Sequence, residues 1–193
     1  MIIIGITGTL GAGKGTIVDY LTDKKGFAHY SVRGFLLKEI RRRGMPEDRD
    51  SMFNLANELR ADHGPSYVVD ELFEEAKCGD RNSIIESIRT TGEIASLRDK
   101  GNFYLFAVDA DPGLRYERIR LRKSETDAVS FETFLENERR ESVSADPGVQ
   151  NLQACIREAD FIFLNKGTIP ELHQEVDAVL RRISVPNNEN YEQ

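Results

Sequence analysis

Short apolar runs alternate with longer amphipathic stretches along the 193 residues of this chain. Four runs have the length and content of buried strands, and a fifth, weaker run resembles them: 2–7, 82–87, 103–109, 159–165 and, more weakly, 27–31. The stretches between these runs show helical periodicity: 14–25, 34–43, 51–61, 66–78, 112–123, 131–142 and 169–183. This alternation predicts an α/β protein whose parallel sheet is covered by helices on both faces.

Two polar segments interrupt the alternation of strands and helices. Residues 41–66 carry polar, helical sequence where a plain crossover would return to the sheet, and residues 120–134 interrupt the pattern after the run at 103–109. Ligands of open α/β sheets bind beyond the carboxyl ends of the strands, so we expect both segments to be flaps over a substrate. Residues 1–185 are expected to form one domain, followed by a flexible polar tail at 186–193.

Composition and charge are those of an ordinary globular protein. Hydrophobic residues make up 39% and charged residues 31% of the chain, which is enough for one well-formed core. The net charge of −7 argues against a protein that coats nucleic acid. No stretch approaches the roughly 20 apolar residues of a membrane span, and the first residues do not form a signal peptide. We therefore expect a cytoplasmic protein, with Cys78 and Cys155 as reduced thiols.

The sequence GTLGAGKGT, at residues 8–16, has the spacing of a phosphate-binding loop. It follows an apolar strand and opens a helix, which is the context that this motif requires. Backbone N–H groups of such a loop point at phosphate oxygens, and Lys14 can reach the β- and γ-phosphates. The predicted ATP-binding residues of the loop are Gly11, Ala12, Gly13, Lys14, Gly15 and Thr16. Gly15 occupies the place where the general motif has a hydroxyl, and the hydroxyl follows one position later, at Thr16.

The loop resembles that of the nucleoside monophosphate kinases, which is written G-x-x-G-x-G-K-G-T. This resemblance implies a three-layer P-loop kinase fold with about five parallel strands, and ATP and Mg²⁺ as cofactors. It also implies that Thr16 contacts a phosphate and that the metal is held mostly through water and phosphate oxygens. The opening GITGTLGAGKGT is also similar to that of dephospho-CoA kinases, which usually have serine after the lysine.

Two further segments resemble the acceptor side of nucleotide kinases. Residues 29–44 are similar to the segment where a hydroxyl and an arginine meet the acceptor, although Phe35 replaces the usual aspartate. Residues 84–98 resemble the strand, acid and arginine of deoxynucleotide kinases, with Glu86 in place of the usual aspartate. The resemblance makes 41–66 an acceptor-binding insert. The predicted acceptor-binding residues are Ser31, Arg33, Arg60 and Arg89.

Charged side chains near the strand ends are the candidates for catalysis. A carboxylate at Glu86 can order a magnesium-bound water or take a proton, so we assign the metal site to Glu86 and Thr16. Arg115, Arg118 and Arg122 share one face of the helix after the run at 103–109. The resemblance implies a lid near 120–130, although a solvated basic stripe explains the spacing too. The predicted catalytic residues are Lys14, Glu86, Arg118 and Arg122.

The segment ADFIFLNKGT, at 159–168, resembles the last strand and adenine loop of dephospho-CoA kinases. The resemblance implies that Asn165, Gly167 and Thr168 bind ATP. A plain helix N-cap at Thr168 accounts for part of the same pattern.

We predict that the chain transfers the γ-phosphoryl group of MgATP to a nucleoside or deoxynucleoside monophosphate. Two alternatives stay open: a dephospho-CoA kinase, and a regulatory P-loop ATPase or nucleotide sensor that phosphorylates no small molecule. The expected partners are small nucleotides, with no nucleic acid and no membrane, and the expected state is a monomer or a weak homodimer.

Overall fold

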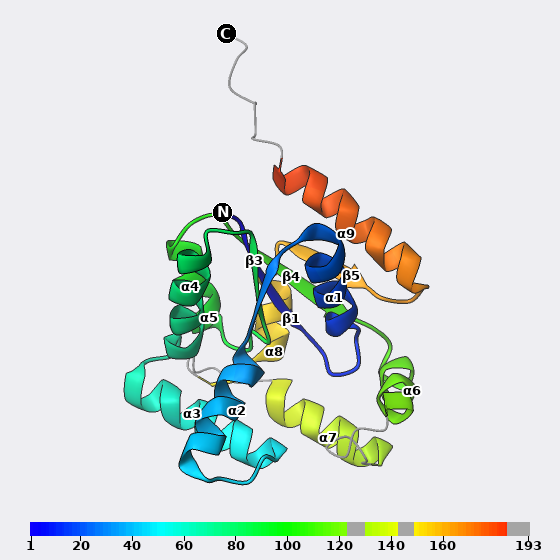
Figure 1. Cartoon of the computed structure of the whole chain (residues 1–193). Helices are drawn as coiled ribbons and strands as arrows, with labels where there is room; N and C mark the ends of the chain where they lie inside the picture. The colour runs from blue at the N-terminus through cyan, green and yellow to red at the C-terminus, as the bar shows by residue number, and fades with distance from the viewer. Residues whose placement is uncertain (123–129, 143–148, 185–193) are drawn as a thin grey trace.

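The computed structural model describes residues 1–122, 130–142 and 149–184 (Figure 1). Its centre is a five-stranded sheet with the order β2-β3-β1-β4-β5, in which all neighbouring strands are parallel. The strands are β1 (Ile3–Gly8), β2 (Ala28–Ser31), β3 (Ser83–Glu86), β4 (Phe103–Asp109) and β5 (Phe161–Leu164). The predicted α/β class and the five predicted strands are thereby confirmed.

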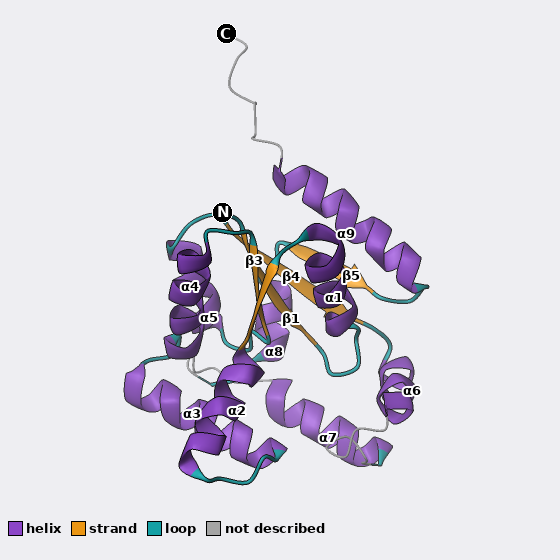
Figure 2. Ribbon diagram, in the orientation of Figure 1, coloured by secondary structure: helices purple, strands orange, loops and turns teal. Residues whose placement is uncertain are grey.

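Helices cover both faces of this sheet (Figure 2). The helices of the described residues are α1 (Lys14–Lys25), α2 (Val32–Arg43), α3 (Arg49–His63), α4 (Tyr67–Gly79), α5 (Thr91–Asp99), α6 (Pro112–Arg122), α7 (Phe131–Ser142), α8 (Leu152–Arg157) and α9 (Ile169–Ser184). The sequence pattern predicted all of these helices except α5 and α8. Helix α3 forms most of the polar segment 41–66, whereas residues 123–129 of the expected lid and the tail from 185 onward lie outside the described residues.

Two apolar cores hold the three layers together, one on each face of the sheet. Alternate residues of β1 serve both cores, because successive side chains of a strand point to opposite faces. Ile4 and Ile6 pack with α1 and α9, whereas Ile3 packs with α2, α3, α4, α5 and α8. Cys155 of α8 lies inside the second of these cores, and burial raises the pKa of its thiol to about 12. Cys78 of α4 is exposed.

The order of the strands sets the place of the functional loop. β1 lies between β3 and β4, so the chain order reverses on the two sides of β1. All five strands point the same way, and the registers pair Ile6 with Glu86 and Glu86 with Ser31. The loop after β1 therefore leaves the sheet at the edge where Ser31, Glu86 and Asp109 also lie. This edge, at the reversal of strand order, is where open α/β sheets bind ligands.

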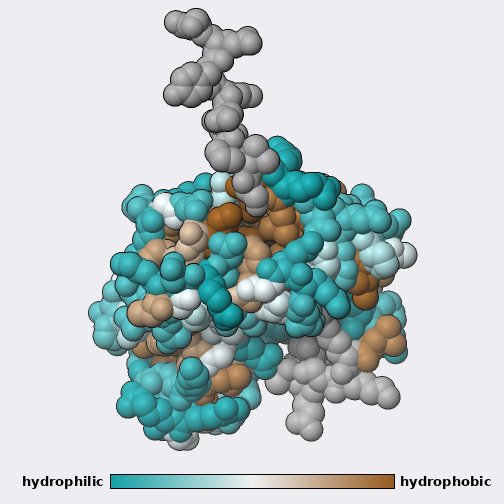
Figure 3. Space-filling model, turned by 45° about the horizontal axis from the view of Figure 1, so that its top comes forward, coloured by the Kyte–Doolittle hydropathy of each residue, from teal (hydrophilic) through white to brown (hydrophobic). Residues whose placement is uncertain are grey.

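The surface matches the composition. Hydrophilic side chains cover most of the face in Figure 3, and apolar patches interrupt them. Within residues 1–122, 130–142 and 149–184, no helix is long and apolar enough to cross a membrane.

Candidate active site

The loop between β1 and α1 has a backbone that depends on glycine. Gly11 and Gly13 have φ angles of 79° and 107°, in the left-handed region that side chains disfavour. Space is also closed to a side chain: an added Cβ would lie 2.5 Å from the carbonyl oxygen of Arg115 at Gly11, and 2.3 Å from Nδ2 of Asn165 at Gly13. The loop is therefore held in shape by close approach from two other segments.

Lys14 crosses this loop instead of pointing into solvent. It is half-buried, and its Nζ donates to the carbonyl oxygens of Gly8 at 2.7 Å and Thr9 at 2.8 Å. Lys14 is also the first residue of α1, whose free N–H groups carry partial positive charge. The ammonium group and the helix start together make the loop a site for anionic phosphate.

Gly15 and Thr16 lie in the first turn of α1. At Gly15 an added Cβ would meet no described atom within 4 Å, so neither space nor backbone requires glycine there. Thr16 is half-buried. The shift of the hydroxyl by one residue thus occurs inside a regular helix, next to the phosphate-binding turn.

Glu86 ends β3 beside the loop. Its Oε1 accepts a hydrogen bond from Ser31 Oγ at 2.8 Å, and His29 Nε2 lies 3.6 Å from the same oxygen. Burial raises the pKa of this carboxyl, but His29, Ser31 and the charge of Lys14 lower it, and the net shift is downward from 4.5. Glu86 is therefore an ionised carboxylate at neutral pH. Sequence reasoning missed His29, because no motif marks it.

The donor set near the loop fits a magnesium ion that is bound mainly by nucleotide and water. Among the described residues, no group of three or more His, Cys, Asp or Glu side chains could hold a metal ion. Mg²⁺ in phosphoryl-transfer sites is usually bound through one or two carboxylates and the phosphates of the substrate. One ionised carboxylate, Glu86, and one hydroxyl in the first turn of α1, Thr16, are residue types that match this pattern.

Asp109, the last residue of β4, is hydrogen-bonded to the phosphate loop. Its Oδ1 accepts hydrogen bonds from Thr9 Oγ1 at 2.7 Å and from the Ala110 amide at 2.9 Å. These contacts join the end of β4 to the loop after β1. Thr9 was not singled out from the sequence, because the loop motif allows any residue at that position.

The segment after β5 is hydrogen-bonded to the phosphate loop. Asn165 is buried, and its Nδ2 donates to the carbonyl oxygen of Ala12 at 2.8 Å. Thr168 is exposed, and its amide and hydroxyl donate to Glu171 Oε2 at 2.7 and 2.9 Å, which makes it the cap of α9. At Gly167 an added Cβ would lie 2.3 Å from this same oxygen. The helix-cap expectation for Thr168 is met, Asn165 contacts the phosphate loop, and ATP binding by Asn165, Gly167 and Thr168 stays a prediction.

Two arginines of α6 lie against the phosphate loop. Arg118 donates to the carbonyl oxygens of Ala12 at 3.3 Å and Asn165 at 3.2 Å, neither of which carries a formal charge. Arg115 is buried and donates to the carbonyl oxygen of Leu10 at 3.3 Å and to Glu138 Oε1 at 2.6 Å. It thereby ties α7 to the loop, a role that the sequence did not reveal.

Arg122 is the last residue of α6, and its side chain lies outside the described residues. Its predicted part in a lid stays a prediction.

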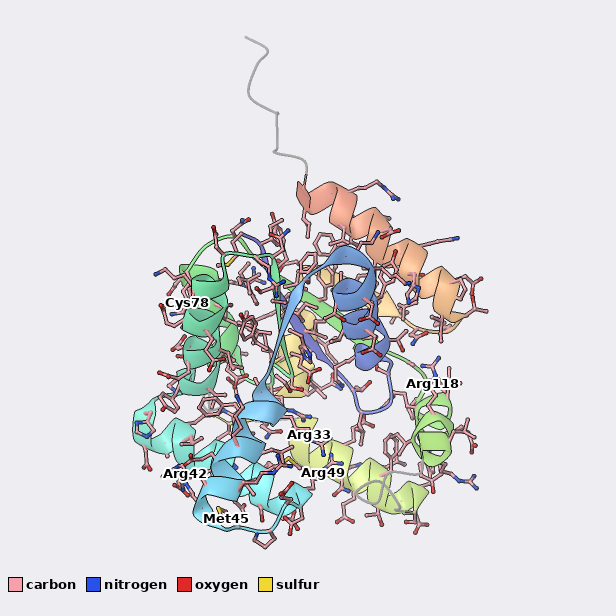
Figure 4. All side chains as sticks on the ribbon, viewed as in Figure 1. Arg33, Arg42, Met45, Arg49, Cys78 and Arg118 are labelled. Atoms are coloured by element: carbon pink, nitrogen blue, oxygen red, sulfur yellow. The ribbon has the colours of Figure 1, made fainter. Side chains whose placement is uncertain are left out.

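The four predicted acceptor residues separate into two pairs. Arg33 is exposed on α2, and Arg89 is half-buried after β3. Figure 4 labels Arg33 near the start of α2 and Arg118 on α6. Ser31, by contrast, is the N-cap of α2, with its hydroxyl between the Gly34 amide and Glu86.

Arg60 requires a correction. Its side chain is only 5% exposed and forms an ion pair with Glu93, with 2.9 Å between Nη2 and Oε1. Direct contact between Arg60 and an acceptor was predicted because the polar insert was read as a binding surface. The packing of α3 turns this side chain into the interior instead.

Comparison with known protein families and sequences gives a consistent assignment. Residues 4–144 match the sequence profile of the AAA domain family. A UPF0200 protein of Pyrobaculum aerophilum is 29% identical over 180 residues, which is 92% of this chain and 96% of that protein. A UPF0200 protein of Hyperthermus butylicus is 27% identical over 184 residues, or 95% of each chain.

Solved structures resemble the fold. TT1252 from Thermus thermophilus superposes with a TM-score of 0.63 at 22% identity, covering 94% of this chain and 97% of that one. Shikimate kinase from Bacteroides thetaiotaomicron gives 0.55 at 14% identity, with 93% and 98% covered. A gluconokinase from Sinorhizobium meliloti gives 0.54 at 13% identity, with 94% and 93% covered. The chain has a P-loop kinase-like α/β fold, as its sequence predicted.

Proposed function

Because the chain belongs to the AAA domain family, we propose that its phosphate loop serves phosphoryl transfer from MgATP to a nucleoside or deoxynucleoside monophosphate. One observation carries the proposal: the register of β1 and β3 pairs Ile6 with Glu86, so this ionised carboxylate ends its strand at the edge of the sheet where the loop to Lys14 begins. A cation and a carboxylate at the end of the sheet are the groups that a phosphoryl-transfer site requires.

Each side chain has a role in this reaction. The loop amides and Lys14 bind the β- and γ-phosphates of ATP and neutralise charge that grows during transfer. Glu86 and Thr16 would hold Mg²⁺ together with the phosphates, and the ion would supply further positive charge. Among the described residues, Arg118 donates to uncharged oxygens of Ala12 and Asn165, so its positive charge is available to the donor phosphates.

The acceptor nucleotide is assigned to the residues of α2 and of the segment after β3, whereas Arg118 of α6 is assigned to the donor. Arg33 and Arg89 bind the phosphate of the acceptor, because the planar guanidinium group offers two parallel donors to phosphate oxygens. A monophosphate acceptor is already ionised at neutral pH, so the reaction needs no base to remove a proton from it. Glu86 can then serve the metal alone.

A dephospho-CoA kinase is the second candidate, and the contact between Asn165 and Ala12 favours it. That contact joins the segment at 159–168, which resembles the adenine loop of dephospho-CoA kinases, to the phosphate loop. The acceptor would then be a ribose hydroxyl, and the ionised Glu86 would accept its proton.

A regulatory ATPase or nucleotide sensor is the third candidate. Ser31 and Arg60 are engaged within the fold, and Nη1 of Arg89 donates to Gln150 Oε1 at 3.4 Å, so fewer groups are left for an acceptor. Such a protein would hydrolyse ATP slowly, whichever acceptor is present.

Coupled measurement of ADP release tests these candidates. ATP and Mg²⁺ are supplied with a panel of nucleoside monophosphates, their deoxy forms and dephospho-CoA, and Lys14→Ala serves as the inactive control. We expect one monophosphate to accelerate ADP release by orders of magnitude. Acceleration by dephospho-CoA alone supports the second candidate, and slow release with every compound supports the sensor.

A further inference from the structure

A buried ion pair joins the polar insert to the segment after β3. Arg60 belongs to α3 and Glu93 to the first turn of α5, and their side chains are only 5% and 1% exposed. Nε and Nη2 of Arg60 donate to Oε1 of Glu93 at 3.3 and 2.9 Å. Nη1 of Arg60 also donates to Asn57 Oδ1 at 3.4 Å.

The second oxygen of Glu93 holds the backbone next to Arg89. Oε2 accepts hydrogen bonds from the amide of Arg89 at 2.7 Å and from the amide of Thr90 at 3.1 Å. The carbonyl oxygen of Arg89 accepts a hydrogen bond from the Asn151 amide at 2.9 Å. The backbone of Arg89 is therefore fixed at both its donor and its acceptor group.

Stability alone does not account for this arrangement. Two charges removed from water lose much of their solvation, and apolar replacements of buried ion pairs are often as stable. The capping of α5 by Thr90 and Glu93 is local and does not need a partner from α3. What Arg60 adds is a directional link between the insert and the carboxylate that holds Arg89.

We infer that Arg60 and Glu93 are positioning residues for the acceptor phosphate. They couple the place of α3 to the place of Arg89, so that the insert and the phosphate-binding arginine form one unit. Neither residue touches the substrate. The inference rests on the proposed function, in which Arg89 binds the acceptor.

The test is the double variant Arg60→Met/Glu93→Gln. It removes both charges together, so no charge is left buried without a partner, and glutamine keeps an oxygen for the amides of Arg89 and Thr90. We expect the acceptor KM to rise roughly tenfold or more, because small displacements of a positioning group have large effects. The kcat and the KM for ATP should stay within about twofold of wild type, since the phosphate loop is unchanged.

A matched control makes the same chemical change at an exposed pair. Arg43 and Glu58 link α2 to α3, and their side chains are 29% and 48% exposed. Arg43→Met/Glu58→Gln should leave both KM values as in wild type, because an exposed pair fixes little. A rise of the acceptor KM in this control as large as in the double variant would overturn the inference.

A variant cycle identifies the route of the effect. In an Arg89→Ala background, Arg60→Met/Glu93→Gln should produce no further rise of the acceptor KM, because the residue they position is gone. If the two effects instead multiply, the pair does not act through Arg89, and the inference is wrong.

A binding measurement separates this inference from the proposed function. Inorganic phosphate is titrated while the Nε–Hε resonance of Arg89 is followed by NMR, which requires no turnover. The double variant should need roughly tenfold more phosphate than wild type for the same change in that resonance. If wild type phosphorylates no monophosphate but this difference is found, the proposed function fails and the positioning role stands. Equal titrations in both proteins would refute the positioning role.

Discussion

The donor side and the acceptor side of the candidate site are built in different ways. The donor side is a short backbone loop, residues 8–16, shaped by glycine at left-handed φ angles. The acceptor side depends on side-chain pairs between distant segments, such as Ser31 with Glu86 and Arg60 with Glu93. A backbone loop can be recognised from its sequence, whereas a pair across 33 positions cannot. The difference explains why the phosphate loop was predicted from the sequence, whereas the pair of Arg60 and Glu93 was not.

The largest effect is expected from Lys14→Ala on the donor side. Nζ of Lys14 donates to the carbonyl oxygens of Gly8 and Thr9, and loss of this ammonium group removes charge stabilisation from the transferred phosphate. We expect kcat/KM to fall about a thousandfold or more, on the scale of a lost transition-state donor. Turnover is measured with the best acceptor. The melting temperature without nucleotide should stay close to that of wild type, and undiminished turnover would remove the basis for the donor assignment.

Glu86→Gln tests the carboxylate between the two sides. The change keeps the shape of the side chain and removes its charge, so we expect kcat to fall about a hundredfold, in line with the loss of a group that orients a metal ion. The Mg²⁺ concentration for half-maximal rate should rise, with little change in ATP affinity. Asp109→Asn is the comparison, because Asp109 also ends a strand at this edge. A severe loss in Asp109→Asn beside normal activity in Glu86→Gln would move the metal site to β4.

Gly13→Ala and Gly15→Ala form a matched pair within the loop. At Gly13 the added Cβ meets Asn165 Nδ2 at 2.3 Å with φ at 107°, and we expect a loss of about 2 kcal/mol in the free energy of unfolding. At Gly15 the helix is open, and alanine should stabilise by up to about 1 kcal/mol. Urea unfolding measures both changes. Equal effects of the two substitutions would mean that the loop backbone is not the constraint.

The smallest expected effect is the pH dependence of the stability that the Glu86 carboxylate contributes. The pKa of Glu86 lies below its ordinary value of 4.5 in the folded protein. The ionised carboxylate therefore contributes stability that is fully present above that value and is lost as the pH falls through the folded pKa. The difference in melting temperature between wild type and Glu86→Gln should shrink as the pH is lowered from 7 to 3. A difference that grows over this interval would contradict the assigned direction of the shift.

The strands were predictable because each is a continuous apolar run, as expected for parallel strands buried on both faces. Helix α5 was missed although its start carries the Thr90-x-x-Glu93 signature of a capping box. That segment was interpreted through its acid and its arginine, and the helix signal went unused. Helix α8 has six residues, too few for a periodic pattern to appear.

The site was predictable where its chemistry follows from the backbone. The loop, Lys14 and the strand-end position of Glu86 all follow from a strand, a turn and a helix in sequence. Arg60 was assigned wrongly because its orientation depends on how α3 packs, and single-residue spacing does not encode that. Thr9, His29 and Arg115 were missed for the same reason, since each acts through a partner on another element.

The two cysteines differ in exposure, and this difference allows a fluorescent dye to be attached at Cys78 alone. The Cys155 thiol lies inside a core with its pKa raised to about 12, so reagents that attack thiolates will not reach it in the folded protein. Cys78 is exposed on α4, next to the elements of the acceptor side. A maleimide dye will therefore attach at one place in the wild-type chain. Its fluorescence can report movement of the insert during turnover without any cysteine being replaced.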